Sequence, residues 1–257
     1  MTAGALETVL RRDRLVVLGA LAGLALLCWL YLASLAPMAT MPGMTAMVPL
    51  AAPWTANDAL ATFLMWSVMM VGMMTPSVAP MILIYARVAR QAASRGTPFA
   101  PAGWFALGYF LAWTGFAALA TGVQWGLERA LLVSPMAASA TPLFGAALLV
   151  AAGIYQWTPL KTACLSHCQS PLQFIQRHGG FRGTRGGSLG LGLRHGLYCL
   201  GCCWALMLLL FVGGVMNLLW IAAIGALVLA EKLIPGRLFQ RVTGAALFFA
   251  GVLLLLR

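Results

Sequence analysis

The amino-acid sequence predicts an all-α membrane protein, a polytopic bundle of about seven transmembrane helices whose N-terminus is cytoplasmic. The first observation is composition: of 257 residues, 62% are hydrophobic and only 8% are charged, whereas about a quarter of a soluble domain is charged. The second is a series of apolar runs near the ~20 residues that a spanning helix needs. Because these runs are continuous and do not alternate, they exclude a β-barrel.

Seven apolar stretches are the predicted spans. They are residues 15–36, 58–85, 102–124, 140–160, 191–212, 216–234 and 238–256. The first is expected to be a span and not a signal peptide, because its run is longer than a signal core and Pro37 makes a poor cleavage context. No remaining segment is long enough for a soluble domain, so residues 1–257 are expected to form a single membrane domain.

The connections between spans carry residues that end helices. The loop 37–57 contains four prolines and no lysine or arginine, so it is expected to face outward as irregular chain. The loop 86–101 is basic and is broken by glycine and proline. The longest cytoplasmic loop is 161–190, and Pro235 and Gly236 mark the inner turn before the last span.

The third observation is the distribution of positive charge, which sets the orientation. With the N-terminus inside and seven spans, every lysine and arginine except Arg129 and Arg257 falls on the cytoplasmic side. This is the positive-inside pattern of a multi-pass protein of a bacterial inner membrane. The net charge of +11 is therefore a topology signal with contact to anionic lipid, and nucleic-acid binding is not expected.

Two groups of methionines are candidate copper ligands, because thioethers are soft, uncharged donors that favour Cu(I). The outer loop carries Met38, Met41, Met44 and Met47, one every third residue. The second span carries Met69, Met70, Met73 and Met74, which form two neighbouring rows along the helix, and Pro76 could interrupt the helix below them. The alternatives are an apolar loop on the membrane surface for the first group and gap-filling core residues for the second.

Two groups of cysteine and histidine are candidate metal ligands. The fifth span carries His195, Cys199, Cys202 and Cys203, and the first three fall within about a 60° arc of one helix face. Thiolates with one imidazole suit Cu(I) or Zn(II), although small buried cysteines and a hydrogen-bonded histidine are the alternative. Cys164, His167 and Cys168 follow the fourth span at spacings that place them on one face of a helical turn, or they are simply reduced cytosolic thiols.

The second-span methionines and the fifth-span cysteines are both expected near mid-depth of a hydrocarbon core about 30 Å thick. They could meet across a helix interface, but the sequence does not establish that these two helices touch. Glu231 and Lys232, at the inner end of the sixth span, are interpreted as an interfacial pair, and Cys28 as a packing residue.

Two segments carry a family resemblance. The segment from Met65 to Ser77 reads MWSVMMVGMMTPS, and the segment from His195 to Met207 reads HGLYCLGCCWALM. Together with Met216-Asn217 and Glu231-Lys232, they resemble the bacterial family of predicted metal-binding integral membrane proteins, a domain of unknown function. The resemblance covers about residues 60–235, and it implies metal binding without a defined reaction.

Three functions fit these patterns. The first is a Cu(I)-binding membrane protein that transports or hands over copper through methionine, cysteine and histidine ligands, with a copper chaperone or copper enzyme as partner; zinc or another transition metal is the alternative cargo. The second is a membrane metalloenzyme, for which Tyr198, Trp204 and Asn217 could line a cavity. The third is a thiol–disulfide redox protein built on Cys199 and Cys202. The lipid bilayer is a partner in each case, and oligomerisation is left open.

Overall fold

The computed structural model describes residues 3–40, 53–97, 99–133, 138–139 and 141–256, with side chains from Arg14 onward except at 37–40. Regular structure in these residues is helical, apart from an isolated β-bridge between Val133 and Ser139. The helices are α1 (Ala3–Thr40), α3 (Ala56–Ser94), α4 (Ala102–Arg129), α5 (Pro142–Gln156), α6 (Pro159–Gln169), α7 (Pro171–Arg177), α8 (Arg185–Leu208), α9 (Leu210–Gly213), α10 (Leu218–Leu233) and α11 (Arg237–Leu255). The prediction of an all-α membrane bundle is confirmed.

The number of spans is close to the expectation but is not the same. Among the described residues, five helices are long and apolar enough to cross a membrane, or up to six if the bent pair α5–α6 counts as one span. Helix α10 coincides with the predicted sixth span, but its 16 residues cover only about 24 Å at 1.5 Å per residue. The expected count of about seven is therefore approximate.

The predicted fourth span, 140–160, coincides with α5, and a local proline signal separates α5 from the helix that follows it, α6. Thr158 is extended, with φ −72° and ψ 146°, and its side chain caps α6 by accepting a hydrogen bond from Lys161 N. Pro159 follows at the first helical position, where its missing N–H costs nothing, and it disfavours helical geometry at the residue before it. The chain consequently bends by 68° between α5 and α6. The expected cytoplasmic loop 161–190 is largely helical, as α6 and α7.

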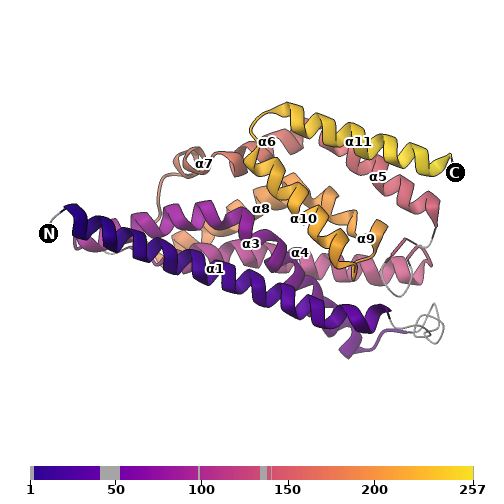
Figure 1. Ribbon diagram of the computed structural model, residues 1–257, viewed down its shortest axis with the longest axis horizontal. Helices are drawn as coiled ribbons and strands as arrows, with labels where there is room; N and C mark the ends of the chain where they lie inside the picture. The colour runs from indigo at the N-terminus through magenta and orange to yellow at the C-terminus, as the bar shows by residue number, and fades with distance from the viewer. Residues whose placement is uncertain (1–2, 41–52, 98, 134–137, 140, 257) are drawn as a thin grey trace.

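Helices α1, α3, α4 and α8 form a packed series. Backbone packing is extensive between α1 and α3, between α3 and α4, and between α4 and α8, while α6 packs on α8. Helix α11 packs along α5 as a separate pair at one edge of the bundle (Figure 1). Helices α3 and α8 thus share α4 as a neighbour. Cys28 is buried on α1, and its Cβ would lie 2.9 Å from a Cβ at Gly72 of α3, in agreement with its packing interpretation.

Glycines set the close approach of α4 and α8. A Cβ added at Gly192 would lie 2.0 Å from the Phe105 carbonyl oxygen, and one added at Gly108 would lie 2.0 Å from the Leu189 carbonyl oxygen. Gly196, one turn after Gly192, also meets α4. Small residues four apart on a spanning helix allow such backbone contact. This contact places the cysteine face of α8 against α4.

We expect Gly192→Ala to destabilise the protein by about 1–3 kcal/mol or more, because the added methyl group meets backbone and not a flexible side chain. Thermal unfolding in detergent measures the effect. Gly190→Ala is the matched control, since it lies on the same helix and a Cβ there has nothing within 4 Å. The control should be neutral or slightly stabilising, because alanine favours helix over glycine. Equal behaviour of the two variants would contradict the proposed close packing.

Helix α3 runs without interruption through Pro76 and Pro80. It begins with a capping box in which Thr55 accepts a hydrogen bond from Asp58 N and the Asp58 carboxylate accepts from Thr55 N. Near Pro76, the Thr75 hydroxyl donates to Val71 O at 2.6 Å and the Ser77 hydroxyl donates to Met74 O at 2.9 Å. The suggested break of the helix at Pro76 is not present, and these hydroxyls stabilise the backbone around the proline.

Candidate metal centre

The four predicted ligands on α8 are all buried. His195, Cys199, Cys202 and Cys203 are between 0% and 4% exposed. The thiols of Cys202 and Cys203 both donate to the carbonyl oxygen of Cys199, each at 3.0 Å. These two thiols are therefore turned along their own helix, because a thiol in an apolar interior takes the nearest acceptor.

The thiol of Cys199 lies in a polar cluster to which four helices contribute. Its Sγ is 2.9 Å from Nζ of Lys232 on α10 and 3.0 Å from the hydroxyl of Tyr109 on α4. Lys232 Nζ also donates to Ser77 Oγ on α3 at 2.9 Å, and the Ser77 and Tyr109 oxygens are 3.4 Å apart. We name Ser77, Tyr109, Cys199 and Lys232 the Cys199 cluster. It connects α3 to α8 through side chains.

The predicted ligands on α6 all face α8. Cys164 packs against Gly201, where an added Cβ would lie 2.8 Å from its Sγ. The His167 ring stacks on the Tyr198 ring, with centroids 4.1 Å apart and an interplanar angle of 8°. The Sγ of Cys168 lies 4.0 Å from the Sγ of Cys202. The spacing of these three residues thus places them on one helix face, and Cys168 comes nearest to the buried thiols of α8.

A cavity of about 220 Å³ opens beside these groups. Its lining includes Cys168, His195 and Lys232, together with Ser77 and Met81. The His195 ring packs among aromatic rings of α4 and α7, and its Nδ1 is buried with no hydrogen-bond partner in the described structure. A buried imidazole nitrogen without a partner calls for an explanation, and a metal ligand role would supply one. The cavity gives such an ion a place beside Cys168 and His195.

The methionines of α3 form a buried row that leads to the Cys199 cluster. Met69, Met70, Met73 and Met74 are 0% to 4% exposed. The Sδ of Met74 lies 4.0 Å from Ser77 Oγ, which belongs to the cluster. Ser77 in turn contacts Lys232, which contacts Cys199, so two side chains separate Met74 from Cys199. All four are also packed core residues, in line with the gap-filling alternative.

The outer methionine group cannot be placed in this arrangement. Met41, Met44 and Met47 lie outside the described residues, and Met38 lies in the last turns of α1 at a position whose side chain is not described. Their role in copper capture stays a prediction.

The side chains as placed do not form a complete metal site. Within the described part of the chain, no three His, Cys, Asp or Glu side chains converge so that they could hold one ion. The thiols of Cys202 and Cys203 are turned toward the Cys199 carbonyl oxygen, and a change of χ1 rotamer would redirect them without moving the backbone. The donor set fits a soft ion, since the Cys168 thiol and the His195 imidazole line one cavity and the Cys202 thiol lies 4.0 Å from that of Cys168.

The interpretation of Glu231 and Lys232 as an interfacial pair was wrong. Glu231 pairs with the buried Lys161 of α6, with Nζ and Oε2 2.6 Å apart, and also accepts a hydrogen bond from Gln156. Lys232, 9% exposed, points instead to Cys199. Adjacent residues of a helix point 100° apart, so the Glu231 carboxylate contacts α6 and the Lys232 ammonium contacts α8. The signal that could have identified Lys232 was a charge within an apolar predicted span.

Comparison with known protein families identifies a match that covers most of the chain. The model of the PpoB2 family, described as a copper chaperone, matches residues 63–254. No curated protein and no solved structure matches the chain. The matched region includes every cysteine, histidine and lysine described above around the cavity, and it extends the region of the resemblance toward the C-terminus.

Proposed function

Because this chain belongs to the PpoB2 family of copper chaperones, we propose that it binds Cu(I) with the thiols at the α6–α8 contact and hands the ion to an acceptor protein. The observation that carries the proposal is the meeting of Cys168 with Cys202 beside the cavity that His195 also lines. The two thiols come from two helices, and a change of side-chain rotamer would be needed to bring them and the His195 imidazole to one ion. Copper is the cargo of this site and not a resident cofactor.

The charge balance of the site supports a monovalent ion. Cu(I) held by two thiolates carries a net charge of −1, and an uncompensated charge inside a membrane protein is costly. Lys232 is buried, and its ammonium already lies 2.9 Å from Cys199 Sγ. It would neutralise such a thiolate–copper unit, which identifies Lys232 as a positioning residue and not as a ligand.

The methionines of α3 provide the approach to this site. Their thioethers are weaker donors than thiolates and add no charge, so an ion could exchange along the row without becoming trapped. Met74 is the member next to the Cys199 cluster. We propose that copper passes along this row between the membrane surface and the thiols. The outer methionines Met38, Met41, Met44 and Met47 would capture the ion first, in the orientation that the positive charges predict.

The route along the methionines is tested with Met73→Leu/Met74→Leu, a volume-conserving change that removes two thioethers. We expect Cu(I) loading from a weak soluble Cu(I) complex to slow by about tenfold, as for other changes beside metal sites. The final copper-to-protein ratio should equal that of the wild type, because the thiols remain. Stopped-flow loading and endpoint copper content measure the two quantities. An unchanged loading rate would contradict a route through these methionines.

A further inference from the structure

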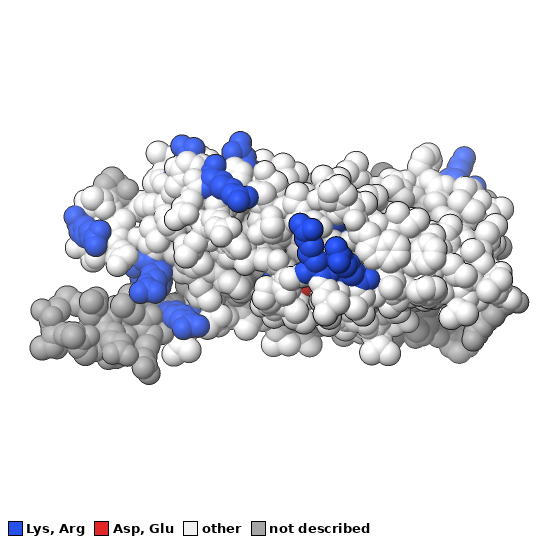
Figure 2. Space-filling view, turned by 90° about the horizontal axis from the view of Figure 1, so that it is seen from above, with Lys and Arg blue, Asp and Glu red and all other residues white. Residues whose placement is uncertain are grey.

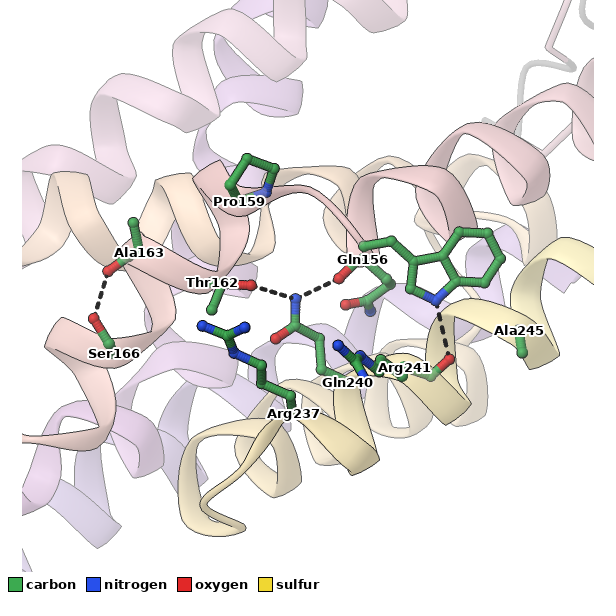
Figure 3. A pocket seen from close by; sticks show the side chains of 10 residues that line it. Gln156, Pro159, Thr162, Ala163, Ser166, Arg237, Gln240, Arg241 and Ala245 are labelled. Atoms are coloured by element: carbon green, nitrogen blue, oxygen red, sulfur yellow. Dashed lines mark hydrogen bonds between the residues drawn. The ribbon is translucent and has the colours of Figure 1, made fainter.

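A second, larger cavity lies at the bend between α5 and α6, next to the start of α11. Its volume is about 760 Å³, and its lining includes Gln156, Trp157, Thr162, Arg237 and Arg241. Figure 3 shows the Arg237 and Arg241 side chains reaching toward it from α11, on either side of Gln240. The copper proposal does not use this cavity.

The cavity has a fixed polar frame. The Gln240 amide donates to Gln156 O and to Thr162 Oγ1, the latter at 3.3 Å, and these contacts join α11 to α5 and α6 (Figure 3). The Trp157 indole N–H donates to Arg241 O at 3.2 Å. Gln156 is 1% exposed, and its Oε1 has no hydrogen-bond partner in the described structure. Tertiary hydrogen bonds of Gln240 and of the Arg241 backbone therefore fix the start of α11, which carries both arginines, against α5 and α6.

The charge of the cavity is positive. Arg237 and Arg241 are exposed and are one helical turn apart, so they share a face of α11. Neither makes an ion pair with any residue that the structure describes. The nearby carboxylate of Glu231 is already neutralised by Lys161. Basic side chains gather on this face in an otherwise mostly uncharged surface (Figure 2).

The start of α11 adds further donors for an anion. The cap residue Gly236 has φ 106° and provides no side-chain cap, so the first amides of α11 lack a side-chain acceptor. Such amides favour a phosphate oxygen, which the positive end of the helix dipole also attracts. Arg237, the first residue of α11, also lines the cavity, so the start of α11 and the two guanidiniums favour an anion at this end of the cavity.

The surface beside the cavity is apolar and suits acyl chains. Leu238 and Val242 of α11 are 77% and 58% exposed, and Ile154 of α5 is 50% exposed. In a membrane protein these side chains face lipid, and Trp157, 47% exposed, is of the type enriched at the membrane–water interface. A cationic cavity at the end of an apolar surface matches a molecule with an anionic head and hydrocarbon tails.

We propose that this cavity binds the phosphate headgroup of an anionic phospholipid, with Arg237 and Arg241 as its charged contacts. In the orientation that the positive charges predict, the site faces the cytoplasmic leaflet, where basic pockets between helices bind lipid headgroups. The bound lipid would cover the α5–α11 pair and hold it against α6. The site is independent of the thiols, so it persists whether or not copper is bound.

The test uses the full-length protein in nanodiscs that contain phosphatidylglycerol and phosphatidylcholine, or phosphatidylcholine alone. After extraction into detergent and washing, we expect mass spectrometry to find about one phosphatidylglycerol retained per wild-type protein. Arg237→Gln/Arg241→Gln should reduce retention at least tenfold. The matched control is Arg95→Gln/Arg177→Gln, which removes two exposed arginines that do not line the cavity, and it should retain the lipid.

Two results would overturn the proposal. Equal retention by the two double variants would show only general attraction of anionic lipid to a basic surface. Displacement of the lipid by soluble glycerol phosphate at low millimolar concentration would assign the site to a soluble phosphate ligand. Retention by the control, loss by the cavity variant and resistance to glycerol phosphate together support the lipid site.

Discussion

Replacing Cys168, Cys199 and Cys202 together by serine is expected to weaken Cu(I) retention by the protein at least ~100-fold. Changes to groups that merely support metal ligands already cost 10–100-fold in affinity, and this variant removes three soft donors. Serine hydroxyls are hard donors that bind Cu(I) poorly. The measurement is copper content after anaerobic Cu(I) loading and competition with a Cu(I) chelator.

The matched control for this loss is Cys28→Ser. Cys28 is also a buried cysteine, but it lies on α1 against Gly72 and not beside the cavity. We expect this variant to retain copper as the wild type does. If the triple variant keeps wild-type copper content while remaining folded, the thiols at the α6–α8 contact are not the copper site.

Breaking the buried ion pair between Lys161 and Glu231 is expected to have the largest effect on stability. The two side chains are 0% and 2% exposed, and their charged atoms are 2.6 Å apart. Lys161→Met leaves the Glu231 carboxylate buried without its counter-charge, which costs about 3–5 kcal/mol. Thermal unfolding in detergent should show a marked decrease in Tm for this variant.

The double variant Lys161→Met/Glu231→Gln distinguishes a lost ion pair from lost packing. It removes both charges and keeps an oxygen that can accept the hydrogen bond from Gln156 Nε2. Since paired buried charges roughly balance their desolvation cost, the double variant should recover most of the lost stability. A double variant as unstable as Lys161→Met would assign the effect to packing of the lysine stem.

The sequence is sufficient to predict the helical membrane bundle, because apolar runs and proline or glycine boundaries act locally. It does not predict the bend at Thr158 and Pro159 or the short α10, since both depend on where a helix ends within a continuous apolar stretch. Helical spacing is also enough to place Cys164, His167 and Cys168 on one face, which the structure brings against α8.

The Cys199 cluster could not be predicted, because its members come from four helices that are distant in sequence. Lys232 is 33 residues from Cys199 and 155 residues from Ser77. Periodicity gives the face of each helix, but it does not give the partner of that face. The side-chain connection from α3 to α8 and the different partners of Glu231 and Lys232 required the tertiary structure.

The structure brings together a different pair of cysteines from the pair on which the thiol–disulfide redox hypothesis rested. That hypothesis used Cys199 and Cys202 as a Cys-x-x-Cys pair, but the Cys202 thiol donates to the Cys199 carbonyl and not to its sulfur. The sulfur that lies 4.0 Å from Cys202 is that of Cys168. The proposed copper site and a Cys168–Cys202 disulfide would therefore use the same two thiols. The identity of the atoms around copper distinguishes the two functions.

X-ray absorption at the copper K-edge of the anaerobically Cu(I)-loaded protein tests the central claim most directly. We expect a Cu(I) spectrum whose nearest scatterers are mainly sulfur, and we expect this sulfur signal to decrease markedly in the Cys168→Ser/Cys199→Ser/Cys202→Ser variant. A nearest shell of only nitrogen and oxygen in the wild type, or a sulfur shell that is unchanged in the variant, would contradict a copper site at the α6–α8 contact.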